Sequence, residues 1–176
     1  KEGIETTGNQ ITVQGGKPVI TLHSVKVNGD CALRIRDEAN VTLILDGENS
    51  MCSKKSNCVY VSDNSYLTIT SILGDGSSAG TLRAEGNKSV EINHAGIRGG
   101  SITVKGGTVI AKGEYEAAGI GKDAREQNTN FSISIEGGTV EADGGWGGAG
   151  IGSASRAGGN VNINISGGTV KAVGGQ

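Results

Sequence analysis

The string GTLRAEG, at residues 80–86, recurs three times along the chain, as GTVIAKG (107–113), GTVEADG (138–144) and GTVKAVG (168–174). Successive copies begin 27, 31 and 30 residues apart. A period of about 30 residues is typical of solenoids and related arrays, in which each repeat is one structural unit that packs against the next. The chain is therefore predicted to be a repeat protein.

Two further strings repeat in the same order, so each repeat contains three short pieces. They read HAGIR (94–98), AAGIG (117–121) and GAGIG (148–152), and then ITVKGGT (102–108), ISIEGGT (133–139) and INISGGT (163–169). The earlier part of the chain is a looser version of this pattern, with CALRI (31–35) and CVYVS (58–62) standing 27 residues apart.

Within each piece, apolar and polar residues alternate with a period of two. In TVEADG, Val140 and Ala142 point one way, whereas Thr139, Glu141 and Asp143 point the other way. Glycines separate the pieces and permit the positive φ angles that tight corners require. Apolar residues do not follow helical spacing for more than about two turns in any stretch. Each repeat is thus predicted to hold three short β-strands.

A strand with one apolar face must bury that face, and stacked coils provide the cover. The alignment predicts four inward columns: Leu82, Val109, Val140 and Val170; Ala84, Ala111, Ala142 and Ala172; Ile69, Val104, Ile135 and Ile165; and Val61, Ile97, Ile120 and Ile151. Crossovers between parallel strands are overwhelmingly right-handed. We therefore predict an all-β fold: a single-stranded right-handed parallel β-helix, a β-solenoid of about six coils with three short strands per coil, forming one domain over residues 1–176.

Composition and charge exclude several classes of protein. Of the 176 residues, 32 are glycine and one is proline, without the triplet period of collagen. The apolar runs are far shorter than the roughly 18 residues of a membrane span, so we expect no membrane insertion. The net charge of −2 is dispersed and aromatics are few, which argues against nucleic-acid binding. The chain begins at Lys1 without a signal peptide, and we expect it to be a mature fragment of a larger protein.

Two longer stretches carry a resemblance to known proteins: SITVKGGTVIAKG (101–113) and NGDCALRIRDEANVTLILDGEN (28–49). The sequence resembles the β-helical repeat modules of large surface proteins from Gram-positive gut bacteria. It is also similar to a clostridial family of carbohydrate-binding β-helix proteins within the pectate-lyase-like superfamily. The resemblance implies secretion or display on the bacterial cell surface, neighbouring domains in the same chain, and adhesion through a polysaccharide or glycan. It also implies calcium binding, although the acidic calcium ligands of that family have no matching residues here.

Tyr115 and Trp146 are the strongest candidates for a binding site. They stand 31 residues apart at equivalent places in glycine-containing turns, so we expect them to project from neighbouring rungs about 5 Å apart. Exposed aromatic rings are natural platforms for sugar rings. The predicted carbohydrate-binding residues are Tyr115, Trp146, Glu114, Glu116, Asp143, Lys122 and Arg156, with the acidic groups accepting sugar hydroxyls and the two basic groups pairing with uronate carboxylates.

Chemistry beyond binding has little support in the residue pattern. Glu141 and Asp143 share one face of a predicted strand, but Lys112 and Lys171 stand beside them, as on a solvated and charge-balanced sheet. We therefore predict no catalytic residues, no metal ligands and no cofactor. The leading alternative is a polysaccharide lyase or glycoside hydrolase, and a third interpretation is a purely structural stalk segment.

Three cysteines, Cys31, Cys52 and Cys58, lie in the first third of the chain. Cys31 and Cys58 are assigned matching positions one coil apart, which puts their Cα atoms near 5 Å and within disulfide range. A short loop closed by Cys52 and Cys58 is the alternative. Either pairing leaves one thiol unpaired, and three free thiols are an equally open alternative. Of the two pairings, Cys31–Cys58 is slightly favoured.

Overall fold

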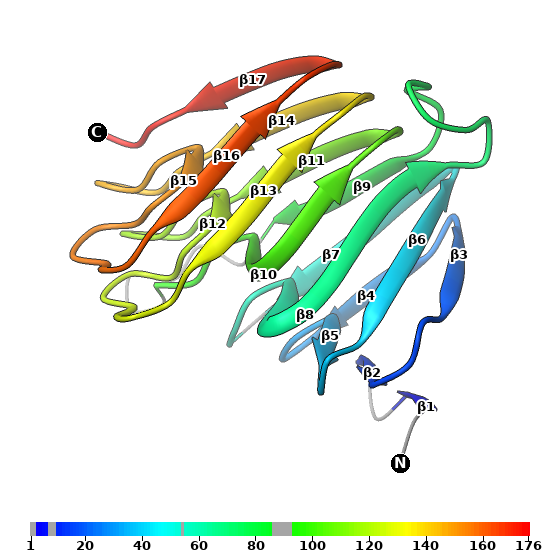
Figure 1. Ribbon diagram of the computed structural model, residues 1–176, viewed down its shortest axis with the longest axis horizontal. Helices are drawn as coiled ribbons and strands as arrows, with labels where there is room; N and C mark the ends of the chain where they lie inside the picture. The colour runs from blue at the N-terminus through cyan, green and yellow to red at the C-terminus, as the bar shows by residue number, and fades with distance from the viewer. Residues whose placement is uncertain (1–2, 7–9, 54, 86–92) are drawn as a thin grey trace.

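A computed structural model describes residues 3–6, 10–53, 55–85 and 93–176, and it shows a right-handed parallel β-helix (Figure 1). Gly86, the last residue of the first GTLRAEG copy, lies outside the described residues. The chain winds through six coils, and each coil contributes to three faces of the rod. The fold, the number of coils and the three strands per coil predicted from the repeats are confirmed.

Each face is a ladder of parallel strands, one from each coil. The first face holds β2 (Ile11–Gln14), β5 (Leu33–Arg36), the beginning of β8 (Val59–Ser71), the beginning of β10 (Ile97–Val104), β12 (Ile120–Gly121) and β15 (Ile151–Gly152). The second face holds β3 (Val19–His23), β6 (Asn40–Asp46), the ends of β8 and β10, β13 (Phe131–Ile135) and β16 (Val161–Ile165). The third face holds β4 (Lys26–Gly29), β7 (Glu48–Ser53), β9 (Thr81–Glu85), β11 (Thr108–Lys112), β14 (Thr139–Asp143) and β17 (Thr169–Val173).

At the N-terminal end of the rod, β1 (Gly3–Thr6) pairs with β2 in the antiparallel sense, unlike the other pairings. The first two faces merge into one 11-stranded sheet because β8 and β10 continue around the corner between them. The third face is a separate six-stranded sheet. In the fifth and sixth coils this corner is instead occupied by longer loops, at residues 122–130 and 153–160. These loops shape the surface that is described below.

The stacked coils bury columns of apolar residues, as the alternation predicted. The register pairs Val109 with both Leu82 and Val140, and it pairs Ala111 with both Ala84 and Ala142. The column on the second face also follows the predicted pairing from Ile69 through Val104 and Ile135 to Ile165. Thus three of the four predicted columns are confirmed.

The fourth predicted column, which runs through Ile97, Ile120 and Ile151, is wrong at its first member, Val61. Ile97 pairs with Val59, and Val61 pairs with Gly99, two residues further along. The register then shifts at the corner between the two faces, where residues 62–65 of β8 lie opposite Gly100 alone, so that β8 carries three additional residues there. A Cβ atom at Gly99 would overlap the carbonyl oxygen of Val61, so only glycine fits this close approach of two strands. An offset of two residues keeps side chains on the same face, which is why Val61 is still buried.

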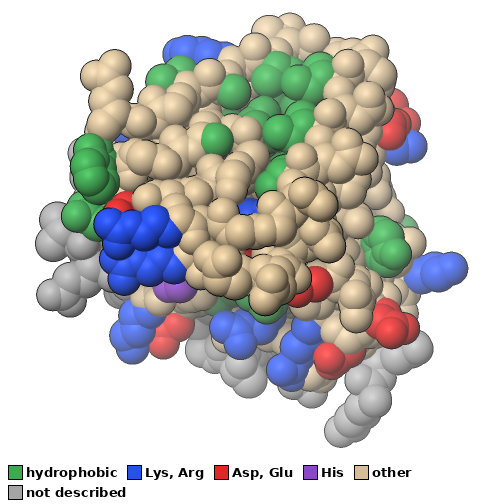
Figure 2. Space-filling model, turned by 60° about the vertical axis from the view of Figure 1, so that its left-hand side comes forward, with side chains coloured by type: hydrophobic (Ala, Val, Ile, Leu, Met, Phe, Trp, Pro, Cys, Tyr) green, Lys and Arg blue, Asp and Glu red, His purple; other side chains and the backbone are tan. Residues whose placement is uncertain are grey.

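The sixth coil is covered on one side only. Ile163, Ile165 and Val173 are 41%, 53% and 46% exposed, whereas Ile133 and Ile135 in the coil before are buried. In Figure 2, in which this side of the molecule comes forward, hydrophobic side chains gather on the surface. The difference follows from stacking, because each coil is shielded by the coil that follows it. Among the described residues, no helix combines the length and apolar character needed to cross a membrane.

Candidate functional site

The turns that follow β11 and β14 bring Tyr115 and Trp146 together, as predicted. Their ring centroids are 6.0 Å apart, and the ring planes are inclined by 35°. Tyr115 is 43% exposed and Trp146 is 57% exposed, so about half of the surface of each residue faces solvent. The two rings form one apolar platform on adjacent coils, and we call them the aromatic pair.

Close backbone packing fixes the aromatic pair. The amide of Gly145 donates a hydrogen bond to the carbonyl oxygen of Ala117 at 2.9 Å, which ties the second turn to the first. A Cβ atom at Gly145 would overlap the backbone of Tyr115. Tyr115 has a positive φ of 43°, an uncommon conformation for a residue with a side chain. The glycines around Trp146 are thus required for two turns to stack at the spacing of one coil.

The two glutamates that flank Tyr115 do not join the aromatic pair at the surface. Glu114 is 7% exposed and Glu116 is 2% exposed. Neither carboxylate oxygen of Glu114 has a hydrogen-bond partner among the residues that the structure describes, and burial raises the pKa of this group to about 7. Glu116 lies 3.6 Å from the guanidinium of Arg125. The expectation that these carboxylates meet a sugar is therefore corrected, because both point into the protein.

The expectation that Lys122 is available at the surface is also wrong. Its side chain is fully buried, and the ammonium group donates hydrogen bonds to the carbonyl oxygens of Thr129, at 2.8 Å, and Gly158. The ammonium lies 5.6 Å from the centroid of the Phe131 ring. Burial lowers the pKa of Lys122. Lys122 therefore holds together the loops at 122–130 and 153–160 and is not available to a uronate.

The remaining predicted residues, Asp143 and Arg156, are exposed. Asp143 ends β14, where the register places it between Lys112 and Val173 on the outward face of the third sheet. Arg156 has a positive φ of 57°, and its carbonyl oxygen accepts a hydrogen bond from the side chain of Gln127. Of the seven predicted residues, four are thus exposed to a ligand: the aromatic pair, Asp143 and Arg156.

The predicted Cys31–Cys58 disulfide is not formed, because all three cysteines are free thiols. Leu33 pairs with Val59, and this register places Cys58 opposite Ala32 rather than Cys31. The predicted alignment of Cys31 with Cys58 is therefore wrong by one residue. Cys31 and Cys58 are buried, and burial raises the pKa of both thiols, to about 12 for Cys58.

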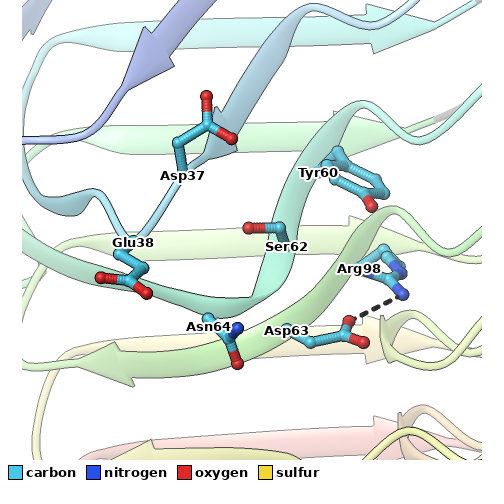
Figure 3. Close-up of a pocket in the computed structure, with 7 residues that line it drawn as sticks. All are labelled: Asp37, Glu38, Tyr60, Ser62, Asp63, Asn64 and Arg98. Carbon is cyan, nitrogen blue, oxygen red and sulfur yellow. Dashed lines mark ion pairs between the residues drawn. The ribbon is translucent and has the colours of Figure 1, made fainter. Parts of the chain in front are cut away.

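A second surface feature was missed by the sequence reasoning. A polar groove of about 370 Å³ opens where the strands of the first face end (Figure 3), and we call it the Arg98 groove. Its lining residues come from the turn after β5, from β8 and from β10: Asp37, Glu38, Tyr60, Ser62, Asp63, Asn64 and Arg98.

Tyr60 and Arg98, which line the Arg98 groove, are outward residues of the first face and stack with Arg34, which lies outside the lining. Arg34, Tyr60 and Arg98 occupy one column in register, and the guanidinium carbons lie 5.6 Å and 4.7 Å from the centroid of the Tyr60 ring. Arg98 also lies 5.0 Å from the centroid of the Phe131 ring. Alternation in CALRI and CVYVS marks Arg34 and Tyr60 as outward residues, so an alignment of the outward column would have found this feature.

A third cluster lies near the turn that carries Tyr115. His94 Nδ1 is 3.2 Å from a carboxylate oxygen of Asp123, and this hydrogen bond raises the pKa of His94. The other Asp123 oxygen accepts hydrogen bonds from the Asn57 amide and from the backbone of Ala95. Asp123 therefore ties three segments together. In the part of the chain that the structure describes, no three His, Cys, Asp or Glu side chains are arranged to hold a metal ion.

Comparison with known proteins supports the repeat architecture. A family model described as a β-helix repeat matches residues 102–121, 133–155 and 163–175, which run from the fourth coil into the fifth, from the fifth into the sixth, and along the sixth. No curated protein and no solved structure matches the chain. The matched segments agree with the parallel ladders and support a β-helix repeat architecture.

Proposed function

We propose that this β-helix module is a non-catalytic carbohydrate-binding domain of a secreted or surface-displayed bacterial protein, in which it serves adhesion. The observation that carries the proposal is the aromatic pair, because two rings on adjacent coils present a continuous apolar surface to solvent. The apolar face of a pyranose ring packs on such a surface, and neighbouring polar groups orient the hydroxyls. Asp143 and Arg156 are exposed and of the right chemistry for that role.

Rigidity also supports binding at this position. The turns are held by backbone hydrogen bonds to adjacent coils, so the backbone that carries the two rings does not have to be ordered when a ligand arrives. A backbone that is fixed in advance reduces the entropic cost of binding. Resemblance to surface proteins of Gram-positive bacteria supports the extracellular setting and the presence of neighbouring domains.

The test is a glycan array, probed with and without millimolar calcium, followed by an assay of each bound polysaccharide for cleavage. We expect binding without cleavage. The Tyr115→Ala, Trp146→Ala double variant should weaken binding by about 2 kcal/mol, or roughly 30-fold, as is typical when buried aromatic contacts are truncated. Calcium-dependent cleavage would favour the lyase alternative, and an array without any bound glycan would favour a structural stalk.

A further inference from the structure

The Arg98 groove has a rigid floor. Arg98 is only 6% exposed, and its guanidinium donates hydrogen bonds to the Val61 carbonyl oxygen at 3.0 Å and to the Glu126 carboxylate. The same guanidinium lies 3.0 Å from a carboxylate oxygen of Asp63, which fixes that side chain at the wall (Figure 3). Ser62 is held by a 2.8 Å hydrogen bond to Ser65. Several of the polar groups are therefore positioned in advance.

The composition of the lining suits a ligand rich in hydroxyl groups. Carboxylates accept hydrogen bonds from hydroxyls, and Asn64 and Tyr60 can both donate and accept. Hydrogen bonds to charged groups are about twice as strong as those between neutral groups. The volume of about 370 Å³ lies within the range of small-molecule sites, roughly 300–1,000 Å³.

The charge of the lining restricts which ligands fit. Asp37, Glu38 and Asp63 contribute three carboxylates, whereas Arg98 contributes the one cationic group of the lining. The charge of Arg98 is also shared with Glu126, outside the groove lining. Arg98 lies 3.0 Å from Asp63 and Arg36 lies 3.7 Å from Asp37, so each of these two carboxylates is paired with a guanidinium. Glu38 forms no ion pair with any described residue, and an anionic ligand would meet its negative charge.

Lys122, a further cation near the groove, does not change the charge balance of the lining. Lys122 is buried, and its ammonium is bound to two backbone carbonyl oxygens. We infer that the Arg98 groove is a saccharide subsite that accepts neutral, hydroxyl-rich sugar units and excludes uronic acids and sulfated sugars. This inference rests on the proposed carbohydrate-binding function and names the class of glycan.

The decisive experiment measures dissociation constants by titration calorimetry, for the whole chain, against a defined panel. The panel contains neutral cello-, xylo-, manno- and galacto-oligosaccharides, an oligogalacturonide, the methyl ester of that oligogalacturonide, and sulfated heparin-derived oligosaccharides. Oligogalacturonide and its ester share one backbone, and in the ester each carboxylate is replaced by a neutral methyl ester. We expect at least one neutral sugar to bind and the ester to bind about tenfold more tightly than the free acid, because like charges within a few ångströms repel strongly.

Two matched double variants locate the effect. Asp37→Asn with Glu38→Gln removes two charges from the rim without touching Arg98 and should bring the ester and the acid to within about twofold. Glu136→Gln with Glu141→Gln removes two exposed charges outside the lining and should leave the tenfold ratio unchanged. Both sites are at the surface, and circular dichroism confirms that each variant is folded.

The outcomes separate this inference from the proposed function. If the rim variant leaves the ester-to-acid ratio unchanged, or if the anionic sugars bind as tightly as the neutral ones, the groove inference is overturned. If the Tyr115→Ala, Trp146→Ala variant keeps full affinity while the rim variant alters the ester-to-acid ratio, the result supports the groove inference. That result would also overturn the proposal that sugars bind on the aromatic pair. If no member of the panel binds at millimolar concentration, both the groove inference and the proposed carbohydrate-binding function are overturned.

Discussion

Replacing Glu114 by glutamine should stabilise the protein in a strongly pH-dependent way. Burial raises the pKa of Glu114 from 4.5 to about 7, and within the described part of the chain both of its carboxylate oxygens lack hydrogen-bond partners. A carboxyl group whose pKa is raised in the folded state favours folding when protonated, so its stability contribution is fully present below pH 4.5. That contribution is lost as the pH rises from 4.5 through 7, because the unfolded chain ionises first.

The size of the effect follows from the shift. At 1.36 kcal/mol per pKa unit, a shift of this size corresponds to about 3 kcal/mol before solvent screening, which lowers the contribution of this group, close to the surface, to about 1–2 kcal/mol. Glutamine has nearly the same shape and no ionisation, so Glu114→Gln should add about 1–2 kcal/mol to the free energy of unfolding at pH 8.5. At pH 4.5 the variant should gain little, because the wild-type side chain is then largely protonated.

Urea unfolding followed by circular dichroism at pH 4.5, 6, 7 and 8.5 measures the difference directly. The pKa of His94 is raised mainly by its hydrogen bond to Asp123, which both proteins keep, and to a smaller extent by the charge of Glu114, which only the wild type has. Glu141→Gln, which makes the same change at an exposed position of β14, serves as the control and should show no pH-dependent gain. A constant difference between Glu114→Gln and wild type across this pH range would refute the reasoning.

Further predictions concern turns, core and loops. Gly145→Ala should separate the aromatic pair and cost about 2 kcal/mol or more, because a Cβ atom there would overlap the Tyr115 backbone; tyrosine and tryptophan fluorescence would report the separation. Val140→Ala should cost about 2 kcal/mol in thermal unfolding, and Val170→Ala, in the same column but on the less covered sixth coil, clearly less. Lys122→Met should cost about 1–3 kcal/mol in urea unfolding, since two carbonyl oxygens would lose their donor; an unchanged midpoint would contradict this role.

The fold was predictable because its determinants are local and repeated. Alternation assigns the face of each strand, and the recurring GGT segment marks the corner between the second and third faces. Three inward columns followed directly from aligning the repeats. The error at Val61 arose because β8 carries three more residues than β10 at the corner between the first two faces, so the register before the corner differs from the register after it. The alternation within an isolated copy of the repeat does not reveal such an insertion.

The candidate site was only partly predictable, for a related reason. Tyr115 and Trp146 occupy equivalent repeat positions, so the register alone brought them together. The burial of Glu116 and Lys122 depends on how the loops at 122–130 and 153–160 fold over neighbouring coils, which involves contacts between residues distant in sequence. The position of Cys58 required an exact register between β5 and β8, and an offset of one residue was enough to suggest a disulfide partner that is not there.

The most direct test of the central claim, that glycans bind on the aromatic pair, uses the emission of Trp146, the single tryptophan of the chain. A neutral oligosaccharide that binds in calorimetry is titrated into the protein while the emission spectrum is recorded. We predict a saturable blue shift with the same dissociation constant as calorimetry, because a sugar covering a ring that is 57% exposed removes it from water. Binding in calorimetry with unchanged Trp146 emission would contradict the claim.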